Sequence, residues 1–145
     1  MEDYNVKVLD EVNKGTTMGM DAISYVSDKV SDERFQKVLD VEYGKYKKIN
    51  QRVEEIYPQY IQTKEPQETN VMNKMMTWYG IQMNTMKDKS NSKISELLLQ
   101  GTNMGIIEGR RLLNNNPSID NEVKQILNDF VVMQEDSVET LKKYL

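Results

Sequence analysis

Apolar side chains recur at steps of three and four residues along nearly the whole chain. This spacing places them on one face of an α-helix, whereas a strand would show simple alternation. The apolar stripes extend over residues 4–30, 33–56, 92–113 and 120–145, and a further helical segment covers about 70–87. The pattern therefore predicts an all-α protein.

Residue types that favour helix N-termini stand at the breaks between the stripes. Ser31 and Asp32 precede the second stripe, Ser92 opens the third, and Ser118 or Asp120 precedes the fourth. We expect these side chains to cap the helices that follow them.

The lengths of the connections predict how the helices are joined. The connections at 29–32 and 114–119 are short, so each joins two antiparallel neighbours. The long connection at 57–91 contains the extra helical segment, which at roughly 27 Å is long enough to return the chain along a bundle. A chain of 145 residues fits one domain. We predict a single domain over 1–145, with a hairpin at about 4–56, a crossover at 57–91 and a second hairpin at about 92–145.

The two predicted hairpins are related by an internal repeat. The segment GTTMG at 15–19 recurs as GTNMG at 101–105, with four of five residues identical at an offset of 86. The second and fourth main helices superpose at an offset of 88, which pairs Tyr46 with Gln134. Paired glycines four residues apart in a soluble helix favour close helix packing over a ligand role, because glycine lacks a side chain and weakens the helix itself.

These glycine-containing segments resemble a family of small bacterial ferritin-like proteins, in which the first helix of each hairpin reads G-E-x-M-G. The resemblance covers nearly the whole chain through the order, spacing and duplication of its helices. It implies a ferritin-like four-helix bundle made of two repeated hairpins, with the extra helix in the crossover.

The same resemblance compares this chain with ferritin-like metal enzymes. In those, the first and third helices each supply a Glu, and the second and fourth each supply Glu-x-x-His. Thr16 and Thr102 stand at the two single Glu positions. Glu42 corresponds to the Glu of the second helix, with Lys45 where the His would stand.

The fourth helix also departs from the metal-binding pattern. Its Glu position corresponds to Phe130 on the repeat, or to Glu135 followed by Val138 in a shifted register. Neither register supplies the His. The resemblance therefore supports the fold and implies that the metal-ligand positions have degenerated.

Glu42 is the leading candidate for a functional residue, because it interrupts an apolar stripe in mid-helix. Thr16, Tyr46, Thr102 and Gln134 are expected to point inward at the same level. One interpretation is a small-ligand site, or a remnant metal site with Glu42 as ligand. The other is a structural layer in which Glu42 accepts hydrogen bonds from the two threonines and Tyr46. Iron and manganese sites gather several carboxylates, so we predict no metal and no other cofactor.

Composition excludes several classes of function. The chain contains no Cys and no His, which excludes Cys-His and Ser-His-Asp catalysis and His-bearing zinc or haem sites. A net charge of −4 with scattered Lys and Arg argues against nucleic-acid binding.

No stretch approaches the roughly 20 apolar residues of a membrane span, and the acidic N-terminus is unlike a secretory signal. We expect a cytoplasmic protein, and one Ala against ten Met suggests an AT-rich bacterial genome.

A methionine stripe marks the helical segment in the crossover. Its members at helical spacing are Met72, Met75, Met76, Met83 and Met86, with Tyr79 among them. Thioethers suit Cu(I), but no Cys or His anchors such a site. We interpret the stripe as packing against the bundle or as a contact between chains, which favours a homodimer or another protein partner.

Three functions compete. The missing His and the two threonines favour a non-catalytic bundle that has lost its di-metal site and has a structural or protein-interaction role. The alternative is a His-free iron or manganese oxidase or storage-type protein using Glu42. The third is a small-ligand binding module with the polar layer as the floor of its pocket. An elongated cavity between the first and third main helices would favour this last hypothesis.

Overall fold

The helical elements follow the predicted stripes closely. The computed structural model describes residues 3–61 and 70–145, with the side chains of 70–76 and 83 left out of the description. Over these residues the chain forms five α-helices, one short 3-10 helix and no strand. The elements are α1 (Tyr4–Ser27), α2 (Glu33–Ile56), η1 (Tyr57–Gln59), α3 (Asn70–Thr85), α4 (Asn91–Asn115) and α5 (Asn121–Lys142). The prediction of an all-α protein is confirmed.

The helix N-termini begin at short polar side chains, as expected, but not always at the predicted one. Asp32 caps α2 by accepting a hydrogen bond from the backbone N–H of Phe35 at 3.1 Å, which confirms that prediction. The cap of α4 is Ser90, which accepts from the N–H of Lys93 at 3.2 Å. The prediction of Ser92 as this cap is wrong, because α4 begins with a polar turn that the apolar stripe does not reveal.

The start of α5 is held by neighbouring segments rather than by its own cap. Asp120 occupies the N-cap position without a side-chain capping bond. Its carboxylate instead accepts from the hydroxyl of Tyr60 at 2.8 Å, and its backbone N–H donates to Asn5 Oδ1 at 2.8 Å. These bonds join the residue after η1 and the start of α1 to the second hairpin.

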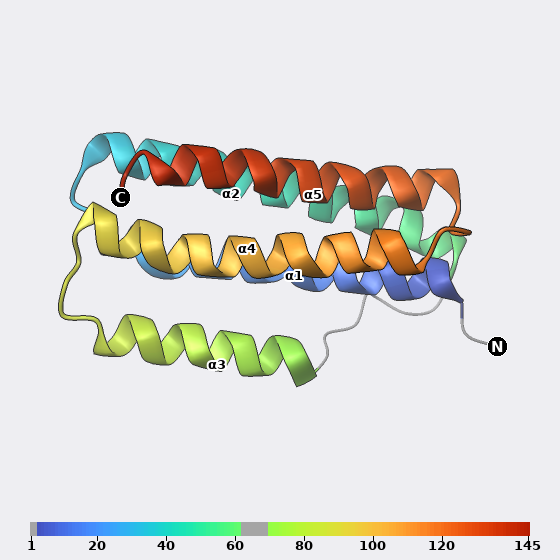
Figure 1. Ribbon diagram of the computed structural model, residues 1–145, viewed down its shortest axis with the longest axis horizontal. Helices are drawn as coiled ribbons and strands as arrows, with labels where there is room; N and C mark the ends of the chain where they lie inside the picture. The colour runs from blue at the N-terminus through green and yellow to red at the C-terminus, as the bar shows by residue number, and fades with distance from the viewer. Residues whose placement is uncertain (1–2, 62–69) are drawn as a thin grey trace.

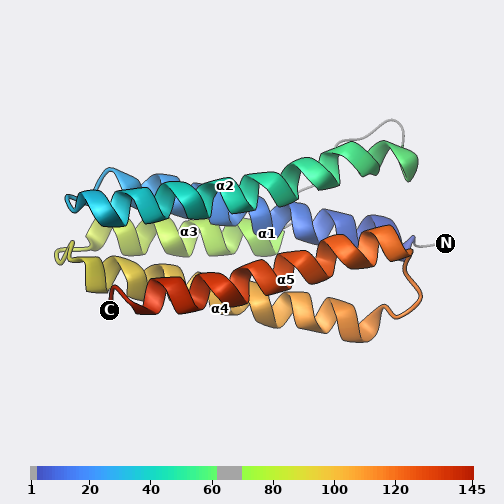
Figure 2. The same ribbon diagram turned by 90° about the horizontal axis from the view of Figure 1, so that it is seen from above.

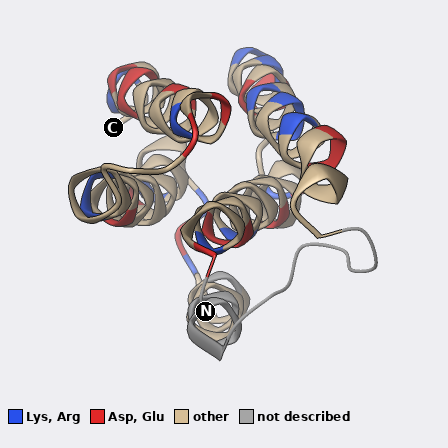
Figure 3. Ribbon diagram, turned by 90° about the vertical axis from the view of Figure 1, so that its right-hand side faces the viewer, with Lys and Arg blue, Asp and Glu red and all other residues tan. Residues whose placement is uncertain are grey.

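The helices form two antiparallel hairpins that lie against each other (Figures 1 and 2). α1 packs with α2 and α4 packs with α5, while α1 also contacts α4 and α2 contacts α5. α2 and α4 run in the same direction, and α3 returns the chain between them (Figure 1). α3 lies outside the group of four, alongside α1 (Figures 1 and 3).

The core lies between the four long helices, each of which buries one apolar face. Fully buried members from all four are Val8, Leu9, Phe35, Leu39, Ile94, Val123 and Leu127. Lys, Arg, Asp and Glu recur on the outward-facing turns (Figure 3). Burial of apolar area is the main favourable term for such a bundle, and it sets which face of each helix is turned inward.

Candidate functional site

A cavity of about 440 Å³ lies between α1 and α4 and reaches inward to α2 and α5. Its apolar lining includes Ala22, Ile23, Leu39, Leu98, Phe130 and Leu141. Its polar lining toward the centre of the bundle includes Glu42, Tyr46, Thr102, Gln134 and Ser137. This size and this mixture of an apolar wall with few polar groups are typical of small-molecule sites.

Glycines on α1 and α4 shape the wall of the cavity. Gly15, Gly19, Gly101, Gly105 and Gly109 all line it. A Cβ atom added at any of these five positions would come within 3 Å of a side chain from another helix. The helices therefore pack closely at these positions, as expected. Each glycine leaves room for a side chain of a neighbouring helix.

Two of these close approaches are equivalent in the two hairpins. A Cβ on Gly19 would lie 2.5 Å from the ring of Tyr46, and a Cβ on Gly105 would lie 1.9 Å from Gln134 Oε1. The repeat offsets of 86 and 88 relate one pair to the other. The glycines therefore fix the positions of two side chains in the central polar layer.

Four of the five residues predicted for the central layer line this cavity, and Thr16 does not. Glu42, Tyr46, Thr102 and Gln134 share the cavity wall and are all buried. Thr16 is fully buried elsewhere.

The partners of Thr16 belong to a separate polar cluster between α1 and α2. Its hydroxyl donates to the carbonyl oxygen of Asn13 at 2.9 Å and accepts from Asn50 Nδ2 at 2.8 Å. Asn50 also donates to Asn13 Oδ1 at 2.9 Å. Thr16 therefore belongs to this cluster, and the prediction that it faces the central site is wrong.

The hydrogen bonds of Glu42 differ from those expected. Its Oε1 accepts from Lys45 Nζ at 3.0 Å, and its Oε2 accepts from the hydroxyl of Ser137. Thr102 instead donates to the carbonyl oxygen of Leu98 at 2.8 Å. The buried carboxylate thus forms an ion pair with a partly exposed cation on its own helix and a hydrogen bond across the bundle to α5.

The residues around Glu42 do not fit a di-metal centre. The described part of the chain contains no group of three or more Asp or Glu side chains placed to hold a metal ion. Phe130 is buried and packs edge-on to Tyr46, with ring centroids 6.4 Å apart. Glu135 lies on the surface, where it pairs with Arg110 at 2.8 Å. Neither register of the fourth main helix brings a second carboxylate to Glu42.

The asymmetry of the Glu42–Lys45 pair leads to a prediction. Glu42→Gln is expected to change the free energy of unfolding by less than about 1 kcal/mol, because Lys45 is 38% exposed and can be hydrated. Lys45→Met is expected to cost about 1–3 kcal/mol, because it leaves a buried carboxylate with one hydroxyl donor. Urea denaturation at pH 7 measures both.

Lys47→Met, at an exposed position on the same helix, serves as the matched control. It is expected to change stability by no more than about 0.5 kcal/mol. A loss of several kcal/mol in Glu42→Gln would show that the carboxylate does more than pair with Lys45.

Tyr46 presents a neutral phenol to the cavity. Burial raises the pKa of Tyr46 to about 12, and the charge of Glu42 acts in the same direction. A hydrogen bond with Thr102 acts the opposite way on this pKa. The hydroxyl therefore stays protonated throughout the physiological range.

Among the described residues that line the cavity, Gln134 carries a buried amide whose nitrogen is unpartnered. Its side chain is 2% exposed, and Nε2 has no hydrogen-bond partner among the described residues. Ser95 Oγ, outside the cavity lining, is the other such atom in the described part of the chain. Buried amides are nearly always satisfied, so this atom requires an explanation.

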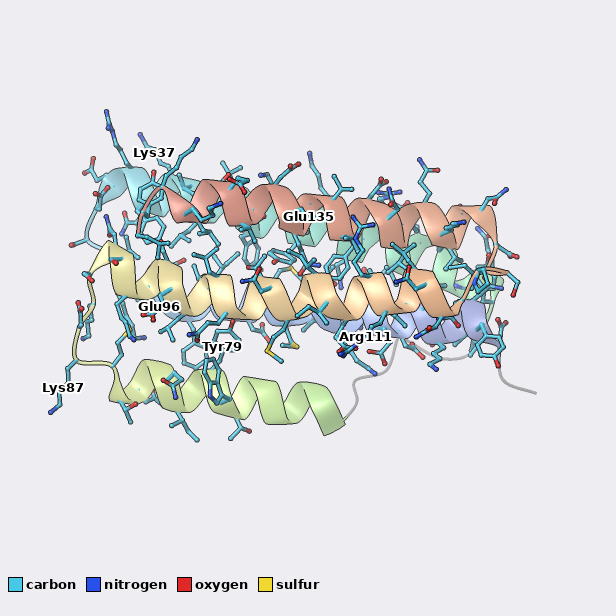
Figure 4. The ribbon with its side chains drawn as sticks, in the orientation of Figure 1. Lys37, Tyr79, Lys87, Glu96, Arg111 and Glu135 are labelled. Carbon is cyan, nitrogen blue, oxygen red and sulfur yellow. The ribbon has the colours of Figure 1, made fainter. Side chains whose placement is uncertain are left out.

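Charged side chains line one end of the cavity as paired ions. Lys14 lies 2.6 Å from Glu11 on α1, and Arg111 lies 2.7 Å from Glu108 on α4. Arg111 lies beyond the N-terminal end of α3 (Figure 4). Each of these two ion pairs joins residues one turn apart on a single helix, and Lys7 also lines the cavity.

The crossover helix contributes Tyr79 to the opposite part of the wall. Its hydroxyl donates to the carbonyl oxygen of Leu97 at 3.0 Å, and its ring lies between α3 and α4 (Figure 4). The predicted methionine stripe falls largely outside the described side chains, which omit Met72, Met75, Met76 and Met83. Met86 packs against the core. The homodimer inferred from this stripe stays a prediction.

The sequence pattern did not predict two contributors to the site, Ser137 and Tyr79, nor the partner that holds Thr16 away from it, Asn50. Ser137 binds Glu42, Tyr79 closes the wall from α3, and Asn50 removes Thr16 from the central layer. Ser137 follows Gln134 by three residues, so its helical spacing offered a signal. The roles of Tyr79 and Asn50 depend on contacts between helices.

Comparison with known proteins adds no family assignment. No family model matches the chain, and no curated protein is significantly similar to it. None of the described helices has an apolar stretch long enough to cross a membrane.

Proposed function

We propose that this protein is a non-catalytic helical bundle of ferritin-like architecture that binds a small, largely apolar molecule between α1 and α4. The observation that carries the proposal is the cavity of about 440 Å³, which reaches the central polar layer. Cavities of this volume accommodate small organic ligands. The elongated space between the first and third main helices is the feature that distinguishes a binding module from a purely structural bundle.

Two observations support the ferritin-like part of the proposal. The two hairpins are joined by one long crossover, with α2 and α4 running in the same direction (Figure 1). The contacts of Gly19 with Tyr46 and of Gly105 with Gln134 are equivalent under the repeat. A duplicated hairpin accounts for both features.

The chemistry of the lining favours binding over catalysis. Three carboxylates of the lining each form an ion pair with a cation on the same helix. The pairs are Glu11 with Lys14, Glu42 with Lys45 and Glu108 with Arg111. Each of these carboxylates is already bonded to a cation, so none is free to face a substrate as a general acid or base. The metal-dependent alternative would need further carboxylates beside Glu42.

Filling the cavity is expected to abolish binding. Ala22 lines the cavity and is 6% exposed, so the larger side chain of Ala22→Leu would extend into the space. We expect wild type to enhance the fluorescence of the neutral apolar dye N-phenyl-1-naphthylamine, and Ala22→Leu to weaken dye binding at least about tenfold, or about 1.4 kcal/mol.

Ser24→Leu adds the same side chain at an exposed position of α1 and is the matched control. It is expected to bind the dye as wild type does. Circular dichroism of the three proteins checks that the helices are intact. Equal dye binding by Ala22→Leu and wild type, or none by wild type, would contradict the proposed function.

A further inference from the structure

The amide of Gln134 is a buried hydrogen-bond donor on the wall of the cavity. It is buried, it lines the cavity, and its Nε2 has no partner among the described residues. An unmade hydrogen bond at a buried donor is unfavourable, and it is relieved when an acceptor occupies the space in front of it. The cavity beside Gln134 is the space from which such an acceptor can come.

The position of this amide is determined by the backbone of α4. A Cβ on Gly105 would lie 1.9 Å from Gln134 Oε1 and 2.8 Å from Cδ. Any side chain other than glycine at 105 would therefore displace the amide. The absence of a side chain at this point lets Gln134 lie against α4 while remaining on the wall of the cavity.

We infer that the bound molecule is uncharged and apolar and carries a carbonyl oxygen that accepts a hydrogen bond from Gln134 Nε2. This inference rests on the proposed function, because it assigns a ligand class to the same cavity. A ketone, ester or amide carbonyl on an apolar body has this chemistry.

The neighbouring charges explain why the acceptor is neutral. Ser137 lies one turn beyond Gln134 on α5 and donates to Glu42 Oε2, so the Glu42 carboxylate is close to this part of the cavity. An anionic acceptor there would be repelled by Glu42. Lys45, the cation paired with Glu42, is already occupied at 3.0 Å.

The surrounding wall explains why the body is apolar. Side chains without polar groups flank the central layer: Ala22, Ile23, Leu39, Leu98, Phe130 and Leu141. These apolar side chains gain by excluding water from an apolar surface, and they offer no partner to additional polar groups. One carbonyl on an otherwise apolar molecule therefore matches the unpartnered amide of Gln134 beside this apolar part of the wall.

Three naphthalene probes of similar shape test the inference. 2-Acetonaphthone carries a neutral carbonyl, 2-ethylnaphthalene carries no polar group, and 2-naphthoate carries an anion. Their affinities for the full chain are measured by displacement of N-phenyl-1-naphthylamine. We expect wild type to bind the ketone about five- to tenfold more tightly than either of the others, the ratio expected for one hydrogen bond.

Gln134→Leu removes the amide and keeps a side chain of similar size. We expect the variant to lose the preference for the ketone while binding 2-ethylnaphthalene at least as well as wild type does. The carbonyl stretching band of bound 2-acetonaphthone gives a readout that is independent of affinity. It is expected at lower frequency in wild type than in the variant, and the wild-type band alone reports the hydrogen bond if Gln134→Leu does not fold.

The outcomes separate the two proposals. Equal binding of the ketone and the hydrocarbon by wild type, with an unshifted carbonyl band, overturns the role of Gln134 but leaves the cavity a binding site. Tightest binding of 2-naphthoate overturns the neutral ligand class. If neither the dye nor any probe binds wild type, the proposed function itself fails.

Discussion

Gly19→Ala is expected to lower the free energy of unfolding by about 1–3 kcal/mol, a range typical of overpacked cores. A single Cβ at this position would lie 2.5, 2.6 and 2.7 Å from three atoms of the Tyr46 ring. An aromatic ring cannot bend away from such a contact, and Tyr46 is itself 6% exposed. Either the ring or the spacing between α1 and α2 must change.

Gly44→Ala is the matched control, since Gly44 lies within α2 and a Cβ there would meet nothing within 4 Å. Alanine favours a helix interior over glycine by up to about 1 kcal/mol. We therefore expect Gly44→Ala to stabilise the protein while Gly19→Ala destabilises it. Guanidinium denaturation of both variants measures the difference, and stabilisation of both would contradict the close packing of Tyr46 on Gly19.

Raising the pH from 10 to 12 is expected to destabilise the fold through its buried tyrosines. Burial raises the pKa of Tyr46 to about 12 in the folded chain, whereas an unfolded tyrosine titrates near 10. Between these values the unfolded chain has lost the proton and the folded chain has kept it. Stability that is fully present below pH 10 is therefore lost as pH rises, by about 2–3 kcal/mol for this one group.

Comparison of wild type with Tyr46→Phe isolates this contribution. Tyr57 adds to the total, because burial and its hydrogen bond to Asp10 also raise the pKa of Tyr57 to about 12. Lysines titrate in the same range as well. The difference between the two proteins in urea midpoint at pH 9, 10, 11 and 12 is thus the relevant measurement, and parallel decreases in both would show that Tyr46 does not contribute.

The extents of the helices could be predicted from the sequence more closely than their ends. The predicted stripe at 33–56 coincides with α2, Glu33–Ile56, because an apolar residue at every third or fourth position can be buried only as a helix. α1 ends at Ser27 instead of continuing to 30, and Ser90 replaces Ser92 as a cap. Ends depend on single side-chain hydrogen bonds, which the periodicity does not record.

The candidate site was predictable only in part. Glu42, Tyr46, Thr102 and Gln134 share one cavity, as their positions on the inward faces suggested. The hydrogen bonds expected between them did not form as predicted, since Glu42 pairs with Lys45 and Ser137. Partners across a bundle depend on the relative rotation and height of two helices, which no single helix pattern contains.

The sequence by itself determined that this protein is helical, which face of each long helix is buried, and that neither Cys nor His takes part in its chemistry. Only the tertiary structure decided that Thr16 joins Asn13 and Asn50, that Gln134 Nε2 is left unpartnered, and that a cavity remains beside it. The physical reason is that periodicity records the environment of each residue relative to its own helix axis. A cavity arises from the fit between helices, and here that fit is set by glycines that receive side chains from their neighbours.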